Sequence, residues 1–351
     1  MKIAVAVSGG VDSMVTAHLL KAARHDIFAI HFLTGYETSD NQPKILSQYF
    51  QKMGVKLITV DMAAHFQSQV VNYFISTYAR GQTPNPCVLC NKRIKFGFLR
   101  AYAMKLGAKK IATGHYAQVE HVKTGCILKK GIDRKKDQSY FLGLLSASQL
   151  AYSIFPLGKW NKADVVDYAM HKGIDTLVAK ESQEVCFIRN RYQDFLVQSG
   201  CIQKQAGPII TTSGNQIGQH NGLHEFTIGQ RRGINCPGPY PYYVVRLEQH
   251  TNALIVGKKE DLLSECFSVH DVNWIVEPPE HPIDIDVRIR YKTPAVKAKL
   301  VPVHLSQAIV YFNSKQSAVT PGQIAVFYQG DIVLGGGLIV NKEISENKFL
   351  I

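Results

Sequence analysis

The sequence predicts an α/β protein with a parallel, Rossmann-like sheet, followed by a small β-rich region and an antiparallel β-barrel. Up to about residue 190, short apolar runs alternate with helical patterns, which is typical of a parallel sheet covered by helices on both sides. Past residue 200, Gly, Pro and Thr become frequent and helical periodicity disappears. Closer to the C-terminus, apolar and charged residues alternate along short runs, as they do in antiparallel barrels.

The chain has 351 residues, more than one hydrophobic core usually organises. We therefore expect three domains, at residues 1–198, 199–265 and 266–351. No apolar run approaches the roughly 18–20 residues that span a bilayer, and the opening MKIAVAV is too short for a signal-peptide core. These features predict a cytoplasmic protein, in which the seven cysteines would not form a structural disulfide framework.

Hydrophobic periodicity predicts the elements of the first domain. One helix carries Val11, Val15, Leu19 and Ala22 on a single face. A later helix, in WNKADVVDYAMHKG, has Asn161 as its N-cap and Gly173 as its C-cap. We expect strands at residues 3–7, 27–32, 56–60 and 110–113, and a further helix at about residues 91–106.

The C-terminal third has the alternating pattern of strands with one buried face. In DIDVRIRY, one face carries Ile285, Val287, Ile289 and Tyr291, and the other carries Asp284, Asp286, Arg288 and Arg290. In VKAKL, Lys297 and Lys299 are expected to point outward. The segment QIAVFYQGDIVLGGGLI is expected to form a hairpin that turns at Gly330–Asp331.

The most specific signal in the chain is SGGVDS, residues 8–13, between the first predicted strand and the first predicted helix. Two glycines allow backbone N–H groups to approach an anion, and the helix adds its unpaired N–H groups and its positive dipole end. The Ser8 and Ser13 hydroxyls can donate to phosphate oxygens. Asp12 suits a phosphate site if it helps to hold Mg²⁺. The loop is not a Walker A motif, because it lacks that motif's lysine.

A second signal is TPNPCVLCNKRIKFG, residues 83–97, in which Cys87 and Cys90 are three apart. Such a pair can be a zinc half-site, a redox pair, part of an iron–sulfur site or two unrelated buried thiols. We place Cys90 at the start of the helix, next to Lys92 and Arg93, where the dipole and the cations would lower its pKa. Cys186 lies between Val185 and Phe187, and from its neighbours alone it resembles a core residue.

The charge of the chain points to a polyanionic partner. The formal net charge is +13, from 40 Lys and Arg against 27 Asp and Glu. Residues 80–110 contain no acidic residue, whereas a solvated helix face normally mixes charges of both signs. A basic surface of this kind attracts a nucleic-acid backbone by Coulomb attraction and counterion release.

SGGVDS resembles the PP-loop of ATP pyrophosphatases, which transfer AMP to an oxygen of the substrate and release pyrophosphate. Further motifs follow in order: the segment at 83–97, ATGHYA (112–117), KKDQSYFLGLL (135–145), ESQEVCFI (181–188) and HEFTIGQRRGI (224–234). Together they resemble the bacterial tRNA-specific 2-thiouridylase family over nearly the whole chain. The resemblance implies a PP-loop (HUP) sheet in the first domain and tRNA-contacting β domains after it.

This resemblance implies 2-thiolation of the wobble uridine (U34) in tRNAs for Lys, Glu and Gln. ATP, with Mg²⁺, would adenylate the C2 oxygen of uracil, and sulfur would then replace it. Cys186 would carry a persulfide received from a sulfur-relay protein or a cysteine desulfurase. Cys90 would be the nucleophile that helps to release the sulfur, leaving a Cys90–Cys186 disulfide to be reduced in each turn.

The resemblance also implies binding residues, position by position. For ATP they are Ala6, Val7, Ser8, Gly9, Gly10, Val11, Asp12, Ser13, Leu33 and Gly114. For the target base they are Asn85, Pro86 and Cys87, and for the rest of the tRNA they are His115, Lys136, Asp137, Gln138, Arg290, Tyr291 and Gln323. From the residues alone, His115 is as well explained as a histidine packed at a strand end.

Position 87 departs from the family pattern, because many members have aspartate after Asn-Pro. With Cys87, the site would contain three cysteines, and a subset of related tRNA thiolases uses three cysteines to hold a [4Fe–4S] cluster. Zinc is less suitable, because no fourth ligand is evident. The persulfide scheme and the scheme with a cluster on Cys87, Cys90 and Cys186 therefore both remain open.

Two other functions are compatible with parts of the sequence. One is a different PP-loop enzyme, either an amidating synthetase or a 4-thiouridine synthase, but no glutaminase-like segment or RNA-binding module ahead of the loop is evident. The other is a non-catalytic RNA-binding protein with a vestigial nucleotide fold. The intact SGGVDS, together with Cys90 and Cys186, favours an enzyme.

Overall fold

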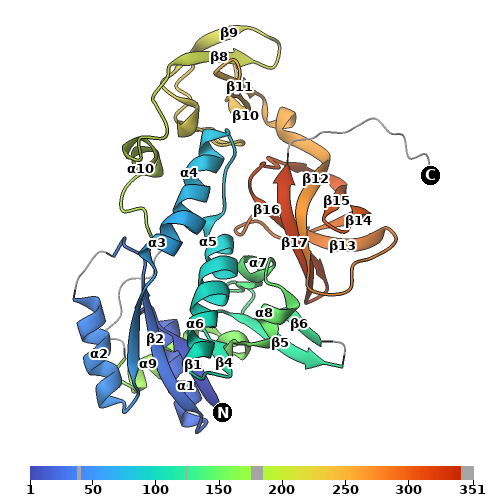
Figure 1. The fold of residues 1–351 in the computed structure, drawn as a ribbon. Helices are drawn as coiled ribbons and strands as arrows, with labels where there is room; N and C mark the ends of the chain where they lie inside the picture. Colours follow the sequence, from blue (N-terminus) through green and yellow to red (C-terminus); the bar gives the residue numbers. More distant parts are fainter. Residues whose placement is uncertain (38–40, 124, 175–184, 341–351) are drawn as a thin grey trace.

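A computed structural model describes residues 1–37, 41–123, 125–174 and 185–340 of the protein. It has three parts (Figure 1): an N-terminal α/β part, a central group of strands at the top of the view, and a C-terminal barrel beside them. Within the described residues, no helix is both long and apolar enough to cross a membrane. The predicted fold class is confirmed.

The N-terminal sheet consists of five parallel strands in the order β3-β2-β1-β4-β7. Both faces are covered, which is why Ile3, Ala4 and Val5 on neighbouring positions of one strand are all fully buried. The four predicted strands all form, with ends shifted by at most one residue: β1 (Lys2–Ala6), β2 (Asp26–Leu33), β3 (Leu57–Asp61) and β4 (Lys110–Ala112). The fifth strand, β7 (Ser153–Ile154), was not predicted.

Helices α1 (Val11–Ala22), α2 (Gln42–Lys52) and α9 (Lys162–His171) pack on one face of this sheet through a shared apolar core. The other face is covered by a second core with the helices that run up the middle of Figure 1. These are α3 (Ala63–Phe66), η1 (Gln67–Val71), α4 (Asn72–Ala79), α5 (Pro86–Leu89), η2 (Cys90–Leu99) and α6 (Arg100–Lys105).

The helix predicted at residues 91–106 starts earlier than expected. It begins at Pro86, continues with π-helical winding through η2, and ends at Lys105. Asn85 caps it, because its side-chain oxygen accepts a hydrogen bond from the N–H of Val88 at 3.4 Å. Pro86 suits the first helical position, where its fixed φ is favourable and its missing N–H is not needed. The expectation that Cys90 lies at the helix N-terminus is therefore wrong.

The helix predicted in WNKADVVDYAMHKG is α9, with Asn161 at its N-cap and Gly173 just after its last turn at φ 64°. The Asn161 amide does not cap the backbone; it donates to the carboxylate of Asp164 at 3.3 Å. The start of α9 is held instead by Asp133, whose carboxylate accepts from the N–H of Lys162 at 3.0 Å.

Six antiparallel strands form the C-terminal barrel in the order β12-β15-β14-β13-β16-β17, closed by pairing of β12 with β17. Ile285 and Val287 face its interior, and the hairpin turns at Gly330–Asp331, as predicted. The predicted strand at 284–291 is shorter, because it ends at Arg288. The strands are β12 (Leu263–Trp274), β13 (Ile283–Arg288), β14 (Val296–His304), β15 (Gln307–Ser317), β16 (Ile324–Gln329) and β17 (Ile332–Val340).

The central part is a four-stranded sheet in the order β10-β11-β8-β9 around its own small apolar core. Its strands are β8 (Gly207–Thr211), β9 (Gln216–His220), β10 (Tyr243–Glu248) and β11 (Ala253–Gly257). The chain reaches it through α10 (Tyr192–Gln198). The remaining short helices are α7 (Ser139–Leu142), α8 (Ala147–Ala151), η3 (Pro156–Lys159), η5 (Leu223–Glu225) and η6 (Lys259–Leu262).

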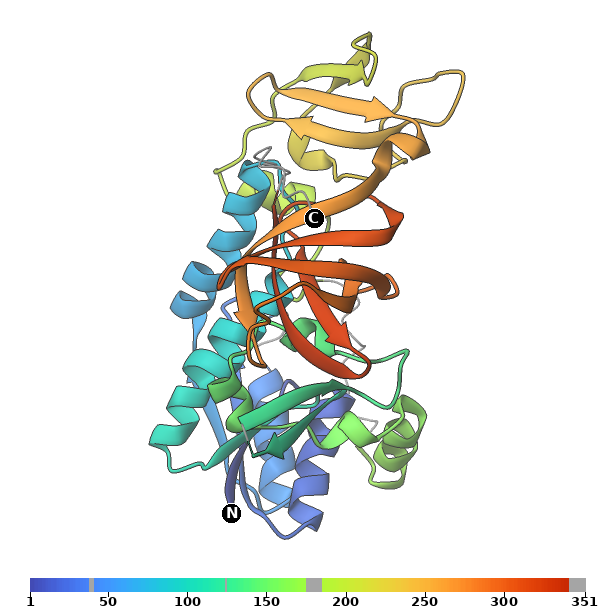
Figure 2. The ribbon, with the colours of Figure 1, turned by 90° about the vertical axis from the view of Figure 1, so that its right-hand side faces the viewer.

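The N-terminal part and the barrel share a sheet. The hairpin of β5 (Ala117–Val122) and β6 (Gly125–Lys130) extends the barrel sheet, because β6 pairs with β17. Figure 2 shows this hairpin lying below the red strands of the barrel. The barrel is therefore held against the α/β part by main-chain pairing as well as by side chains.

Candidate active site

The loop SGGVDS lies where β1 ends and α1 begins, at the carboxyl edge of the parallel sheet. The Ser13 hydroxyl donates to the main-chain oxygen of Gly10 at 2.8 Å and accepts from the N–H of Ser8 at 3.2 Å, so the loop is closed on itself. Gly9 adopts φ +83°, a conformation that favours glycine. The loop is therefore an ordered turn between β1 and α1, and anion binding by it stays a prediction.

Two further residues predicted for ATP lie at this edge. Gly114 follows β4, and a Cβ added to it would lie 2.8 Å from the main-chain carbon of Asp12, so only glycine allows this approach. Leu33 is the last residue of β2, half-buried, on the strand that pairs with β1. The structure thus brings the separate parts of the predicted ATP site together.

Asp12 has two partners that sequence reasoning missed. Its Oδ1 accepts a hydrogen bond from the Tyr116 hydroxyl at 2.8 Å and forms an ion pair with Lys162 Nζ, also at 2.8 Å. Nothing in the local sequence around Asp12 identifies either residue. Mg²⁺ in nucleotide sites is often held by one or two carboxylates and phosphate oxygens, so Asp12 fits as a single protein ligand for that ion.

The three predicted cysteines come from two segments. Cys87 lies in α5 and Cys90 begins η2, so both belong to one continuous helix. Cys186 comes from a loop fixed by its neighbour Phe187, which is 3% exposed and packs edge-on against Phe74 with ring centroids 5.3 Å apart. Cys186 itself is exposed, so its interpretation as a core residue is wrong; Phe187 is the core residue of this loop. The first part of the ESQEVCFI motif, residues 181–184, lies outside the described residues.

The electrostatics of the three thiols differ from the expectation. Desolvation raises the pKa of Cys90 to about 12 and that of Cys87 to about 11, and it also raises the pKa of Cys186. Solvent reaches Cys87 and Cys186, but protein surrounds them enough for lost hydration to dominate. The prediction of a lowered pKa at Cys90 is therefore wrong, because the thiol is buried and its lost hydration outweighs the charge of Lys95.

The charge of Lys95 acts on all three thiols. Its charge opposes the desolvation of all three thiols, and each of these pKa values also responds to a neighbouring thiol or carboxylate. The three sulfurs therefore lie within electrostatic reach of one another. Lys95 lies five positions after Cys90 in the π-helical stretch, where residues five apart are bonded and share a face.

All seven cysteines are free in this structure, including Cys90 and Cys186. Within the described part of the chain, no group of three or more His, Cys, Asp or Glu side chains is arranged to hold a metal ion. The geometry thus does not support the predicted cluster ligands Cys87, Cys90 and Cys186, and we derive no step through a cluster.

The segment that contains Asn85, Pro86 and Cys87 is held by the barrel. Gln323 donates its side-chain N–H to the main-chain oxygens of Thr83 at 2.9 Å and Pro84 at 3.2 Å. Gln323 was predicted to contact tRNA; here it fixes the approach to the helix that carries the cysteines.

His115, predicted at the tRNA interface, is buried. Its Nδ1 shares a hydrogen bond with the Thr113 hydroxyl at 2.7 Å, and its ring lies edge-on to Phe155. Desolvation holds the pKa of His115 well below its usual range, so the ring is neutral. These contacts favour the alternative of a histidine packed at a strand end.

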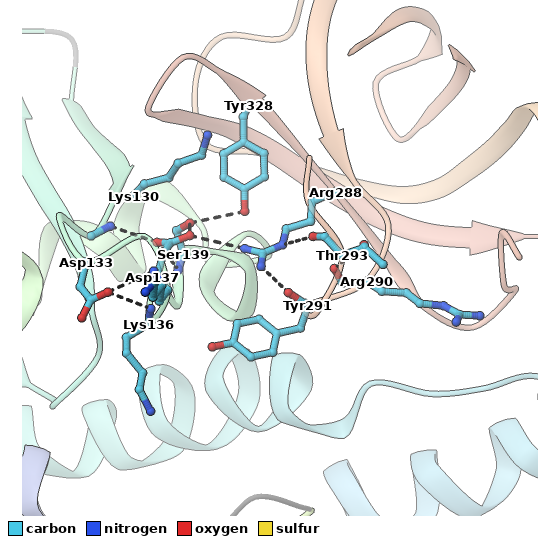
Figure 3. A network of polar contacts seen from close by, with 12 residues as sticks. Lys130, Asp133, Lys136, Asp137, Ser139, Arg288, Arg290, Tyr291, Thr293 and Tyr328 are labelled. Atoms are coloured by element: carbon cyan, nitrogen blue, oxygen red, sulfur yellow. Dashed lines mark hydrogen bonds and ion pairs between the residues drawn. The ribbon is translucent and has the colours of Figure 1, made fainter. Parts of the chain in front are cut away.

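The loop at residues 131–139 joins the α/β part to the barrel through a polar network (Figure 3). Asp137 is 4% exposed and accepts hydrogen bonds from the N–H of Gly131 at 3.0 Å and from the Ser139 hydroxyl at 2.9 Å. Arg288 of the barrel lies 3.6 Å from the same carboxylate. Asp137 was predicted to contact tRNA, but its buried carboxylate is occupied by these partners.

Of the other predicted tRNA residues around this network, Arg290 and Gln138 form hydrogen bonds within the protein. Arg290 donates to the main-chain oxygens of Ile228 and Ala318 and to the Thr320 hydroxyl, so it ties the central part to the barrel. Gln138 accepts from the N–H of Tyr116 at 3.1 Å. By contrast, the side chain of Lys136 points away from the Asp137–Arg288 contact in Figure 3. Tyr291 packs its ring on Phe141 with centroids 4.2 Å apart.

Comparison with family models finds three matches along the chain. A tRNA methyl transferase HUP domain matches residues 1–190, a tRNA methyl transferase PRC-barrel domain matches residues 193–258, and an aminomethyltransferase β-barrel domain matches residues 264–339. The matched ranges follow the three parts of the structure.

Comparison with curated proteins finds relatives named tRNA-specific 2-thiouridylase MnmA. The one from Desulfosudis oleivorans is 48% identical, over 96% of this chain and 94% of its own length. Those from Desulfotalea psychrophila and Aquifex aeolicus are 39% and 37% identical, over 96% and 97% of this chain and 98% and 99% of their own.

Among solved structures, the U34-tRNA thiolase NcsA from Methanococcus maripaludis, determined with its [4Fe–4S] cluster, is 19% identical. The alignment covers 57% of this chain and 65% of that one, with a TM-score of 0.37. A likeness this partial carries no argument about a cluster in this chain.

Proposed function

This chain belongs to the tRNA-specific 2-thiouridylase family of enzymes, and from this premise we propose that it replaces the C2 oxygen of the tRNA wobble uridine U34 with sulfur in an ATP-dependent reaction. We assign it tRNAs for Lys, Glu and Gln as substrates. A sulfur-relay protein or a cysteine desulfurase would supply the sulfur, and the reaction would take place in the cytoplasm.

The first step activates a poor leaving group. The C2 oxygen of uracil attacks the α-phosphorus of ATP, the bond from that phosphorus to the β-phosphate oxygen breaks, and pyrophosphate leaves. The closed loop at residues 8–13, with glycine at positions 9 and 10, supports this step as the cradle of the departing phosphates. A bound Mg²⁺ would neutralise phosphate charge, with Asp12 as its protein ligand.

The second step transfers sulfur. The terminal sulfur of a Cys186 persulfide attacks C2, and AMP leaves with the former C2 oxygen. A Cys90 thiolate then attacks the inner sulfur, the S–S bond breaks, and the uridine keeps the transferred sulfur. Cys90 and Cys186 are thereby oxidised to a disulfide while the transferred sulfur is reduced, so an external dithiol must reset the pair.

One observation carries this proposal: Cys186, from a loop, and Cys90, from a helix in a stretch without acidic residues, lie within electrostatic reach of each other and of Lys95. Burial keeps Cys90 protonated at neutral pH, because it raises the thiol pKa to about 12. Lys95 is therefore needed when a thiolate or a persulfide anion forms. The surrounding positive charge suits an RNA backbone.

The test is reconstitution. Anaerobically purified protein is incubated with unmodified tRNA, ATP, Mg²⁺ and a persulfide donor, and nucleosides and nucleotides are then measured by mass spectrometry. We expect one 2-thiouridine and one AMP per turnover. Formation of ADP and phosphate, or AMP without any 2-thiouridine, would contradict the proposal. Iron and sulfide analysis of the same preparation separates the persulfide scheme from the cluster scheme, which requires about four irons per chain.

A further inference from the structure

The ATP loop lacks a lysine of its own, but the fold brings one to it. Lys162 is the first residue of α9 and is far from the loop in sequence. Its Nζ lies 2.8 Å from Oδ1 of Asp12, and the two side chains are only 17% and 26% exposed. The loop thus contains a partly buried ion pair at the point where it turns into α1.

The main chain of Lys162 is held in place by contacts that do not depend on the charge of its side chain. Its main-chain N–H donates to Oδ2 of Asp133 at 3.0 Å, and the other carboxylate oxygen of Asp133 accepts from the N–H of Lys135 at 3.0 Å. Tyr116 donates to the same Asp12 oxygen, and its ring lies 5.9 Å from the Lys162 ammonium. The start of α9 would therefore keep its position if the side chain of Lys162 were neutral.

An uncompensated carboxylate would repel a triphosphate at this position. Like charges in close contact repel each other, and a partly buried site screens that repulsion less than bulk water does. The Lys162 ammonium offsets the charge of Asp12. With three donors, an ammonium can also keep a carboxylate partner and donate to a phosphate oxygen at the same time.

We infer that Lys162 is a catalytic residue of the ATP step, the ammonium that contacts the β- and γ-phosphates and takes the place of the missing loop lysine. The inference rests on the proposed function, because it assumes that residues 8–13 bind ATP. When the bond between the α-phosphorus and the β-phosphate oxygen breaks, the electron pair goes to pyrophosphate. Lys162 stabilises that growing charge and undergoes no covalent change.

The experiment compares Lys162→Met and Lys162→Gln, which remove the charge, with Lys162→Arg, which keeps it. Lys159→Met is the matched control, because Lys159 is an exposed lysine three residues earlier, in η3. ATP binding is measured by calorimetry, and AMP formation is measured with tRNA present. We expect the neutral variants to lose about 10²-fold in the rate of AMP formation, together with part of their ATP affinity. Lys162→Arg should recover most of both, and Lys159→Met should match the unaltered protein.

Thermal melting of each variant shows whether it is folded, and a folded Lys162→Gln suffices if Lys162→Met does not fold. A folded neutral variant with unaltered ATP affinity and AMP formation would overturn the inference. So would a folded Lys162→Arg that loses as much as Lys162→Met, because the position rather than the charge would then matter. If the unaltered protein binds ATP but forms no 2-thiouridine, the proposed function fails, whereas a loss of ATP affinity in Lys162→Gln would still support the inference.

Discussion

The predicted ATP loop, residues 8–13, and the predicted sulfur site, Cys87, Cys90 and Cys186, differ in how many segments of the chain form them. The loop is one continuous stretch closed by hydrogen bonds between its own residues, as between Ser13 and Gly10, and Gln42, Tyr116 and Lys162 bond to it from outside. The sulfur site takes Cys87 and Cys90 from a helix and Cys186 from a loop held by an aromatic cluster. A local motif carries its geometry with it, whereas an assembled site depends on every segment that supports it. The two regions should therefore respond differently to substitution.

The largest effect should come from the cysteines. Cys186→Ser or Cys90→Ser should lower the formation of 2-thiouridine by at least about 10³-fold, because each removes a sulfur atom that takes part in bond making. AMP formation should persist, because the ATP loop is separate. Nucleoside mass spectrometry and AMP release measure the two steps. Cys201→Ser is the control, an exposed cysteine that lacks the motif context.

Cys87→Ser distinguishes the persulfide scheme from the cluster scheme. It should keep substantial activity in the persulfide scheme, because Cys87 takes no part in the bond changes proposed above. A loss as severe as that of Cys90→Ser would contradict the persulfide scheme and favour cluster ligation by all three cysteines.

The next largest effect should come from removing the buried ring of Phe187, which holds the Cys186 loop. Phe187→Ala removes a buried ring that contacts Phe66, Phe74 and Phe195, and it should lower the free energy of unfolding by roughly 3 kcal/mol. In the protein that remains folded, thiolation should fall while ATP affinity stays unchanged, because only the Cys186 loop loses its support. Denaturant unfolding and calorimetry measure these two quantities. An equal loss of ATP affinity would show that the two regions are not independent.

Gly9→Ala should distort the backbone of the loop at residues 8–13. Gly9 has φ +83°, and an added Cβ would lie 2.9 Å from the side-chain nitrogen of Gln42, so the substitution should cost about 1–2 kcal/mol locally. We expect ATP affinity to fall by roughly tenfold, with little change in how the cysteines react with an alkylating reagent. Gly214→Ala is the control, a glycine with φ +89° whose added Cβ would contact nothing. A Gly9→Ala protein with unaltered ATP affinity would contradict this account of the loop.

Gln323→Ala should have a smaller effect, on the sulfur site only. It removes two hydrogen bonds to the main chain before Asn85, which should cost about 1 kcal/mol of stability. The helix that carries Cys87 and Cys90 would then be less well positioned, so thiolation should slow severalfold while AMP formation is retained. Unchanged thiolation with reduced tRNA affinity would instead favour the original prediction, that Gln323 contacts tRNA.

The smallest effect at neutral pH should come from the titration of the thiols, because Cys90 stays protonated there. The folded-state pKa of Cys90 is about 12, raised from an ordinary value of 9.0. The unfolded chain therefore loses this proton first as the pH rises. Stability is unaffected by Cys90 below about pH 8 and decreases between about pH 9 and pH 12.

Alkylation followed by mass spectrometry tests the same shift. Cys90 should react far more slowly at pH 8 than Cys201, and its reaction should accelerate up to the highest pH at which the protein stays folded. Lys95→Met should raise the pKa of Cys90 further, because it removes the opposing charge. Lys105→Met, an exposed lysine in the same continuous helix, is the control. A Cys90 that reacts at pH 7 as fast as Cys201 would contradict the burial argument.

Residue patterns were sufficient for much of the fold. Four of the five strands of the parallel sheet, the helix at Asn161 and the hairpin at Gly330–Asp331 were predicted because each follows from a short-range rule: continuous apolar runs, capping residues or a turn signal. The early start of the helix at Pro86 was missed, although Asn85-Pro86 is itself a capping signal. That error placed Cys90 at the end of the helix. The direction of its pKa shift was wrong for a second reason, because burial of the thiol raises the pKa.

The sequence by itself predicted which residues carry the chemistry: the SGGVDS loop and Cys90 from their own residue patterns, and Cys186 from the family resemblance. It did so because backbone geometry at glycine and the reactivity of a thiol are properties of the residues themselves. Only the tertiary structure decided what surrounds them. In the folded chain, His115 and Asp137 are buried. Arg290 donates to main-chain oxygens, and Lys162 forms an ion pair with Asp12. Burial, ion pairing and desolvation depend on groups that are distant in sequence and close in space, so no local pattern contains them.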